Sequence, residues 1–379
     1  MTFTKDTEFA EPIRVVHAVG KVVAGGVEAV VMNYYRNIDR SKIQFDFIMD
    51  GYQKTLIDEE IKRMGGLVYK VEPYEKNLFK NLYQCYKIFK QNRYNVFHCH
   101  MNSLSVLWLF AALIARVPVR ISHSHSTSAK GEGKKTLFKN FLRPFSRLFP
   151  THYCACSAYA GNWLFGSGFY NKGKVKLVKN AINIKRFSFN HEIREKLRKA
   201  FDLENKFVIG HVGRFVYQKN HEFLIGIFNE IHKRNADAVL MLIGTGELEG
   251  LVRQRVNEAG LDNNVLFLGT RQDVNDLMQA MDVFLLPSFY EGLPVVGVEA
   301  QTAGLPCVLS DAMTKETRIT SSTKFLSLTK SAGEWAEEIL SYVNEYKRLK
   351  TDEDIRKAGF DIEYAAQDLA ELYREILCN

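Results

Sequence analysis

The sequence predicts an α/β protein with two domains, each built on a doubly wound parallel sheet. Its 379 residues exceed what one hydrophobic core usually organises. Strand-like apolar runs alternate with helix-like stretches along almost the whole chain, which is typical of a parallel sheet with helices on both faces. The pattern restarts after a charged segment of low apolar content at 183–205. We therefore expect domains at 1–186 and 187–359.

The strand-like runs indicate where ligands should bind. In the first half they lie near 13–18, 43–48, 67–71, 95–99, 119–123, 152–155 and 175–178. In the second half they lie at 207–213, 238–244, 265–269, 283–288, 306–310 and 325–328, and a final stretch at 360–377 has the apolar spacing of a packed helix. Ligands of such sheets sit beyond the carboxyl ends of the strands, so functional residues are expected just after them.

Composition indicates an ordinary globular protein of the cytoplasm. Hydrophobic residues make up 46% of the chain and charged residues 25%. Residues 1–12 lack the pattern of a signal peptide, and no apolar stretch approaches the ~20 residues of a transmembrane helix. The six cysteines are scattered without a second ligand pair at zinc-like spacing, so we expect reduced structural thiols.

Positive charge is concentrated in one segment. The formal net charge is +8, which fits nucleic acid, an anionic membrane or phosphorylated ligands. Residues 130–149 carry six Lys and Arg against Glu132 alone, with Leu and Phe among them at helical spacing. A basic amphipathic helix with Phe on its other face suits a membrane surface. The alternative is a helix that buries its Phe in the core. We expect no nucleic-acid partner.

The strongest motif is FLLPSFYEGLPVVGVEAQTAGLPCVLS, in which Glu291 and Glu299 stand eight residues apart. Pro294 fits the first turn of a helix, which would place Glu299 roughly two turns along. The amides of Gly292, Leu293 and their neighbours would lie at the helix N-terminus, where an anion such as a diphosphate is favoured. The two carboxylates can accept hydrogen bonds from sugar hydroxyls.

This motif resembles the donor-binding signature of glycosyltransferase family 4, a large family of retaining enzymes. VGRFVYQKN at 212–220 and AVGKVVAGGVEAVVMN at 18–33 resemble two further parts of the family pattern, and the match spans nearly the whole chain. ISHSHSTS and SDAMTKETRIT are similar to the subgroup that makes capsular or extracellular polysaccharide. The resemblance implies the GT-B fold, in which two Rossmann-like domains face a cleft. It also implies that the helix at 360–379 packs back on the first domain.

The resemblance assigns roles to residues of the second domain. Arg214 and Lys219 would neutralise the leaving diphosphate, which is electrostatic catalysis by fixed cations. Glu299 would hold the ribose hydroxyls and Glu291 the donor sugar ring. The alternative for Arg214 and Lys219 is an ordinary pair of solvated charges.

Glycines follow two of the predicted strands. Gly25 and Gly26 precede a helix with Glu28 in its first turn, and we expect donor contacts there; a helix start without a ligand is the alternative. GTGELEG at 244–250 imitates a dinucleotide loop, but the next strand ends in Thr270 and Arg271 rather than in the acidic residue that would hold an adenosine ribose. We therefore expect Gly246 to contact the nucleotide, with Thr270 and Arg271 near the base, rather than a nicotinamide oxidoreductase.

Two histidine pairs follow strands of the first half, His98 with His100 and His123 with His125. Alternation sends both members of a pair to one face of the sheet. No cysteine or carboxylate completes either pair as a metal site, so we expect no metal. Family 4 enzymes carry a histidine beside the reacting sugar, and we favour His125; His100 and His123 are acceptor-side candidates. The acidic run 352–354 follows the last strand and is expected to be solvated surface.

These features predict a retaining, metal-independent glycosyltransferase. Its donor would be a nucleotide diphosphate sugar, most commonly a UDP-sugar in this family, and its acceptor a glycan or a polyprenyl-linked glycan. We expect no cofactor, and a location in the cytoplasm or at the inner membrane face. The alternative is a non-catalytic GT-B subunit that binds a partner transferase or glycan.

Overall fold

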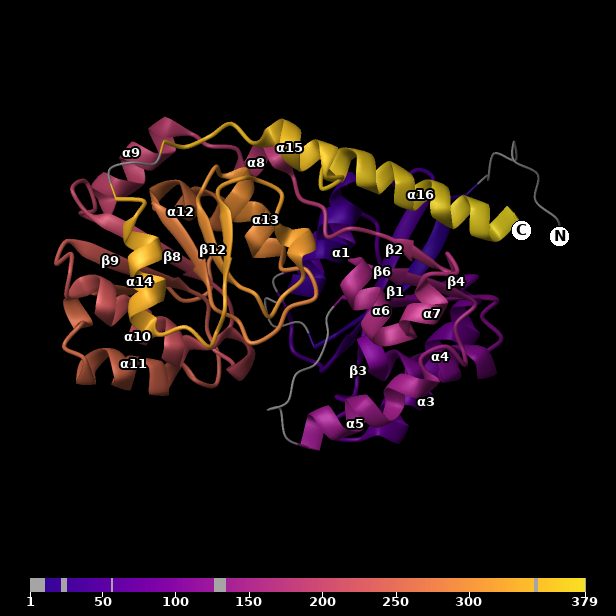
Figure 1. The fold of residues 1–379 in the computed structure, drawn as a ribbon. Coiled ribbons are helices and arrows are strands. Elements are labelled where there is room, and N and C mark those ends of the chain that lie inside the picture. The colour runs from indigo at the N-terminus through magenta and orange to yellow at the C-terminus, as the bar shows by residue number, and fades with distance from the viewer. Residues whose placement is uncertain (1–10, 22–25, 56, 126–133, 344–346, 379) are drawn as a thin grey trace. The chain divides into compact units, whose positions relative to one another are not determined.

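The chain folds into two α/β units, each with one parallel sheet (Figure 1). The computed structural model describes residues 11–21, 26–55, 57–125, 134–343 and 347–378. The first unit contains the described residues up to Ala181 and those from Ile362 onward, and the second contains the described residues of Ile182–Asp361. The predicted fold class, two doubly wound Rossmann-like domains, is confirmed.

The first unit has seven strands in the order β3-β2-β1-β4-β5-β6-β7. They are β1 Ile13–Gly20, β2 Ile43–Asp50, β3 Val68–Val71, β4 Val96–Cys99, β5 Val119–Ser124, β6 His152–Ala155 and β7 Val175–Leu177. The helices are α1 Gly26–Asn37, α2 Asp58–Arg63, α3 Leu78–Asn92, α4 Ser105–Ile114, α5 Lys134–Leu142, α6 Ala158–Phe165, α7 Ser167–Tyr170 and α16 Ile362–Cys378, with short 3₁₀ turns η1 Asn102–Leu104 and η2 Arg143–Phe145.

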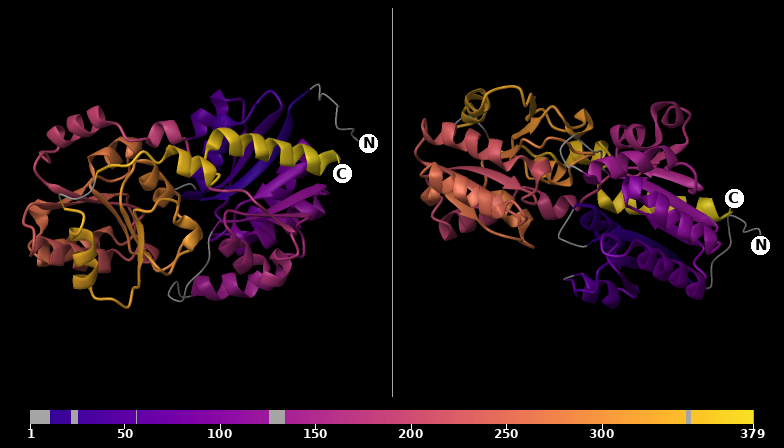
Figure 2. Two further views of the ribbon diagram at one scale, coloured as in Figure 1. Left: turned by 45° about the horizontal axis from the view of Figure 1, so that its top comes forward. Right: turned by 90° about the horizontal axis from the view of Figure 1, so that it is seen from below.

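The two faces of this sheet are packed differently. One face forms an apolar core with α3 and α4, which includes Val16, Phe97 and Trp108. The other face is covered by α1 and α16, which pack against each other (Figure 2). Its side chains are largely aromatic: Tyr35 of α1 stacks on Phe45 with ring centroids 5.3 Å apart, and Tyr373 of α16 meets Phe45 edge-on. The histidines described below belong to this second face.

The second unit has six strands in the order β10-β9-β8-β11-β12-β13. They are β8 Phe207–Val212, β9 Ala238–Ile243, β10 Val265–Phe267, β11 Val283–Leu286, β12 Cys307–Ser310 and β13 Thr323–Leu326. The helices are α8 Ile184–Phe187, α9 His191–Ala200, α10 His221–His232, α11 Glu249–Glu258, α12 Val274–Ala280, α13 Val295–Thr302, α14 Ala332–Leu340 and α15 Asp352–Lys357, with 3₁₀ turns η3 Tyr217–Lys219, η4 Asp262–Asn264 and η5 Lys315–Thr317.

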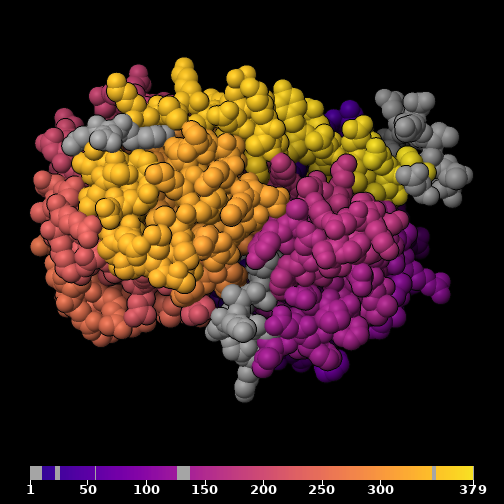
Figure 3. Space-filling model, in the orientation of Figure 1, coloured from indigo at the N-terminus to yellow at the C-terminus, as the bar shows by residue number. Residues whose placement is uncertain are grey.

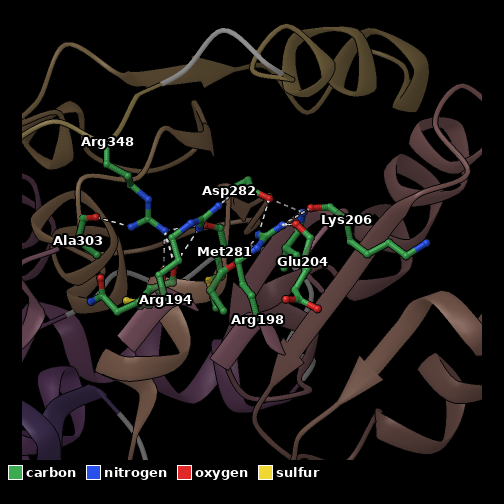
Figure 4. Close-up of polar contacts among 12 residues, drawn as sticks. Arg194, Arg198, Glu204, Lys206, Met281, Asp282, Ala303 and Arg348 are labelled. Atoms are coloured by element: carbon green, nitrogen blue, oxygen red, sulfur yellow. Dashed lines mark hydrogen bonds and ion pairs between the residues drawn. The ribbon is translucent and has the colours of Figure 1, made fainter. Parts of the chain in front are cut away.

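A cluster of arginines fixes the start of β11 in this unit (Figure 4). The Asp282 carboxylate accepts hydrogen bonds from Arg194 at 2.5 Å and from Arg198 at 3.0 Å. Arg348 donates to the carbonyl of Met281 and to carbonyls of neighbouring residues. Because one carboxylate and several carbonyls share three guanidinium groups, α9 and the segment before α15 are both tied to the residues directly before β11.

Two predictions about the segments flanking the motifs can be compared with the fold. Asp352–Lys357 forms α15, in which Glu353 and Asp354 are exposed as expected, whereas Asp352 is half-buried and accepts a hydrogen bond from Ser188 at 2.8 Å. Among the described helices, none is both long and apolar enough to cross a bilayer.

Candidate active site

The second unit brings Lys219 and Glu291 into a buried ion pair. Strands β8 and β11 are neighbours in the sheet, so the segments that follow them meet at its carboxyl edge. Lys219 Nζ lies 2.7 Å from Glu291 Oε1, and both side chains are largely buried. The other carboxylate oxygen, Oε2, accepts a hydrogen bond from Gln218 Nε2 at 2.9 Å. The sequence singled out both charged residues, but neither their pairing nor the part played by Gln218.

Arg214, on the same loop, is exposed rather than buried in an ion pair. Its side chain is exposed and forms no hydrogen bond or ion pair with the other described residues. Gly213, the preceding residue, makes room for the lysine: a Cβ added there would lie 2.9 Å from Lys219 Cε. The loop therefore presents one free guanidinium beside one paired ammonium group.

Gly244 and Gly246 are needed for packing against this loop. A Cβ at Gly244, whose φ is +138°, would lie 2.1 Å from the carbonyl oxygen of Gly213, and a Cβ at Gly246 would lie 2.4 Å from that of Phe215. Phe215 N donates to the carbonyl of Thr245 at 3.0 Å. Close contact between two backbones thus accounts for the glycines of GTGELEG, and a nucleotide contact at Gly246 stays a prediction.

Helix α13 follows the Glu291 loop, although its start differs from the expectation. It spans Val295–Thr302, so Pro294 is its N-cap rather than a residue of the first turn. Glu299 is the fifth helical residue, which is just over one turn along rather than two, at about 3.6 residues per turn. Gly292 and Leu293 are buried directly before the helix, as the motif suggested.

Glu299 is a carboxyl group without a local partner. Its side chain forms no hydrogen bond or ion pair with other described residues, and burial raises its pKa to about 7, while nearby Arg186 acts in the opposite direction. Such a group is poorly solvated when charged, so a ligand that donates hydrogen bonds to it would be stabilised.

An open cavity of about 610 Å³ lies on the same unit. Its lining comprises Arg186, Thr270, Arg271, Gln272, Asp273, Asn275 and Asp276. Arg186 of α8 spans one side, donating to the carbonyl of Gln272 at 2.8 Å and to Asn275 Oδ1 at 3.1 Å. Arg271 is held by Asp273 at 2.6 Å. The sequence placed Thr270 and Arg271 near a nucleotide base, but gave no signal for Arg186, which lies in a charged run between domains.

The first unit gathers five histidines into one buried cluster. His17 of β1, His98 and His100 at the end of β4, and His123 and His125 at the end of β5 lie on neighbouring strands. Each is at most 6% exposed. As alternation predicted, both pairs share one face: the rings of His98 and His100 stack at 4.2 Å, and those of His123 and His125 at 3.9 Å.

Hydrogen bonds join these rings into two chains, which we call the histidine ladder. In one chain His17 Nδ1 lies 3.0 Å from His100 Nε2, and His100 Nδ1 lies 2.8 Å from His125 Nε2. In the other, His98 Nε2 lies 3.0 Å from His123 Nδ1, and His98 Nδ1 lies 2.7 Å from the hydroxyl of Tyr373. The sequence did not single out His17 or Tyr373.

The ladder is neutral at physiological pH. Burial lowers the pKa of His17 to about 3 and that of His125 to about 4, and it lowers the pKa of the other three rings well below the usual range. Two triads, His17 with His98 and His100 and His100 with His123 and His125, bring ligand nitrogens within 4.8 Å. In each triad a third histidine joins one of the two pairs that the sequence showed, and neutral imidazole is the form of histidine that binds metals. The absence of a metal therefore stays a prediction.

Of the two glycines predicted to contact the donor, the structure describes one. Gly25 lies outside the described residues. Gly26 is the first residue of α1, and Glu28 stands in the first turn of that helix, as predicted.

Comparisons with known proteins decide the family. Residues 24–186 match the family described as Glycosyltransferase Family 4, and residues 193–361 match Glycosyl transferases group 1. The chain is 35% identical over 369 residues to the putative glycosyltransferase EpsF of Bacillus subtilis (strain 168), covering 95% of this chain and 96% of that protein. The chain belongs to glycosyltransferase family 4. The family resemblance seen in the sequence is therefore confirmed, and the protein is a glycosyltransferase.

Two further matches span nearly the whole glycosyltransferase. The capsular polysaccharide biosynthesis glycosyltransferase CapH of Staphylococcus aureus is 24% identical over 374 residues, covering 95% of this chain and 98% of CapH. The crystal structure of Anabaena HepE in complex with UDP and glucose superposes with a TM-score of 0.79 at 20% identity, covering 96% of this chain and 99% of HepE. At that identity the likeness concerns the fold, which agrees with the GT-B assignment.

Proposed function

We propose that this glycosyltransferase moves a sugar from a UDP-sugar to a glycan or a lipid-linked acceptor, with retention of configuration and without a metal ion. The observation that carries the proposal is the arrangement of Lys219, Glu291 and Gln218 beside the exposed Arg214. The matches with CapH and with HepE, which was crystallised with UDP and glucose, favour a role in capsular or extracellular polysaccharide synthesis and UDP as the nucleotide.

The chemistry proposed for the second unit is electrostatic. Negative charge builds on the leaving diphosphate as the glycosidic bond breaks, and positioned cations stabilise it. Arg214 supplies a guanidinium fork that is free to bind phosphate. Lys219 is held by Glu291, so its ammonium group is already oriented before the donor arrives. The donor sugar would then contact the Glu291 carboxylate, whose position is fixed by Lys219 and Gln218.

Glu299 and the cavity beside Arg186 are proposed to hold the nucleoside. A carboxylate can accept two hydrogen bonds from a ribose, and Glu299 has no competing partner among the described residues. The cavity offers Thr270 and Arg271 for contacts with the base. The cations Arg214 and Lys219 do the work that a divalent metal does in other transferases, which is why we propose that turnover needs none.

Retention is proposed to follow from displacement on one face of the sugar, assisted by the leaving phosphate. A covalent route would need a carboxylate nucleophile in the first unit. Asp50, at the end of β2, is a carboxyl group at that edge of the sheet; its Oδ1 accepts from Asn81 at 2.7 Å, and burial raises its pKa to about 6. The Asp50→Asn variant therefore tests the route: it keeps turnover if no covalent sugar forms on that residue.

The function is tested by a thermal-shift screen of nucleotide sugars, followed by transfer assays with the sugar that stabilises the protein. We expect stabilisation by a UDP-sugar and an α-linked product from an α-linked donor, read by the anomeric coupling in NMR. A protein that binds no nucleotide sugar, or binds one without transfer or hydrolysis, would instead be an accessory subunit. We propose that the enzyme works in the cytoplasm, at the inner face of the membrane.

A further inference from the structure

Large apolar side chains are exposed on two adjoining parts of the first unit. In the segment 137–148, Leu137, Phe141 and Leu148 are 72%, 66% and 64% exposed, and Phe138 and Phe145 are 43% exposed. On α4, Phe110, Leu113 and Ile114 are also exposed. We call these eight side chains the apolar surface. The rings of Phe110 and Phe149 lie 5.1 Å apart, which links its two parts. Apolar patches of this kind mark interaction sites in soluble proteins.

The apolar surface is fixed to the core from behind, so its exposure is not a sign of loose packing. Leu142, on the inner side of α5, is buried in the apolar core. Ser146 donates a hydrogen bond to the carbonyl of Leu164 at 2.8 Å. Of the two readings of the segment 130–149, burial of its Phe side chains in the core is therefore wrong for Phe138, Phe141 and Phe145. Figures 1 and 3 show the segment at the periphery of the first unit.

Positive charge is concentrated in the part of the sequence that contains this surface. Between Lys76 and Ala181 the chain has 17 Lys and Arg but one acidic residue, Glu132. Because the net charge of the whole chain is only +8, the rest of the chain is net acidic. Two of the cations are held in place beside the apolar surface: Arg143 lies over the ring of Trp163 at 5.4 Å, and Arg147 over that of Phe169 at 5.2 Å.

We propose that the apolar surface and these cations dock the first unit onto an anionic lipid bilayer. Inserted Leu and Phe side chains would enter the boundary between headgroups and acyl chains, while Arg and Lys meet anionic headgroups. A second copy of the chain fits less well, because a two-fold contact would set the same cations against each other. A soluble anionic glycan would pair with the cations but leave eight apolar side chains in water. The proposal deepens the proposed function, since docking would bring the enzyme to a lipid-linked acceptor.

Vesicle sedimentation tests the docking. The full chain is mixed with vesicles of phosphatidylcholine alone or with 30% phosphatidylglycerol, a composition set at roughly the charge of an anionic leaflet. We expect binding to the anionic vesicles only, weakening with added salt because charges are screened beyond about 8 Å at physiological ionic strength. The triple variant Leu137→Ser, Phe141→Ser, Leu148→Ser should lower the partition coefficient at least about tenfold. The control Leu251→Ser, at a 46% exposed leucine of the second unit, should not.

The substituted side chains are exposed, so the variant should keep the melting temperature and the hydrolysis of donor by water. A drop in vesicle binding with donor hydrolysis unchanged supports docking. Absent binding, equal binding to neutral and anionic vesicles, or wild-type binding by the triple variant overturns it. Docking is also overturned if the only effect of the triple variant is to convert a dimer into a monomer in analytical ultracentrifugation. Vesicle binding by a protein that binds no UDP-sugar would uphold docking and refute the proposed function instead.

Discussion

Acidification should unfold the first unit before the second. The five imidazoles of the histidine ladder have pKa values far below 6.5 because they are buried. In the unfolded chain each regains its ordinary pKa of about 6.5. Between those two values the unfolded state binds protons that the native state cannot bind, so the free energy of unfolding falls as pH falls through 6.5 and continues to fall to pH 3–4.

The size of the effect follows from the unfolded pKa alone. At pH 5, each histidine that stays neutral in the native state costs about 2 kcal/mol relative to pH 8. For the five rings of the ladder the loss is about 10 kcal/mol, which is comparable with the whole stability of a domain at about 5–15 kcal/mol. The second unit has two such residues, His211 and His221, and should lose about 4 kcal/mol.

Hydrogen exchange read by mass spectrometry at pH 8, 7, 6 and 5, with rates corrected for intrinsic pH dependence, resolves the two units. Protection of β1, β4 and β5 should collapse between pH 6 and 5, while β8, β9 and β11 keep theirs. In the His17→Gln variant the loss between pH 8 and 5 should be smaller by about 2 kcal/mol. His191→Gln, at an exposed histidine of α9, should change nothing. If both units lose protection together, or neither loses it by pH 5, the ladder is not the cause of a loss of stability in the first unit.

Three further predictions concern the donor side. Lys219→Ala should lower kcat about 10²–10³-fold, and it should lower the free energy of unfolding by about 3–5 kcal/mol because it leaves Glu291 buried and unpaired. The double variant with Glu291→Gln should regain the melting temperature but not turnover. Normal turnover in either protein would remove Lys219 from the mechanism. Because the pKa of Glu299 is about 7 and its charged form is the better acceptor, the affinity for a UDP-sugar, whose phosphates do not titrate in this range, should fall as pH drops from 8 to 6. The Glu299→Gln variant should bind the UDP-sugar weakly and without this pH dependence in calorimetry. Turnover should survive EDTA; its loss and recovery with Mg²⁺ or Mn²⁺ would contradict the role given to Arg214 and Lys219.

Sequence patterns predicted the strands and the motif loops because those features are local. Apolar runs of four to eight residues marked the strands, and the Glu291–Glu299 segment carried its own family signature. The Lys219–Glu291 pair could not be read in this way, since the partners lie 72 residues apart and meet only because β8 and β11 are neighbours in the sheet. Periodicity also left the orientation of 137–149 open, because an amphipathic helix has the same spacing whether its apolar side faces a core or a bilayer.

The histidine ladder also could not be predicted from local sequence patterns. His17 and Tyr373 carry no motif; β1 pairs with β4, and α16 returns from the far end of the chain, so only the tertiary fold joins them to His98 and His100. Because burial keeps all five rings neutral at pH 7, the ladder carries no positive charge that could stabilise a leaving diphosphate. On the proposed mechanism, that charge comes from Arg214 and Lys219. Lowering the pH would protonate the ladder only where the first unit is already unfolding, so we expect protonation of the ladder to give no rise in the rate of transfer.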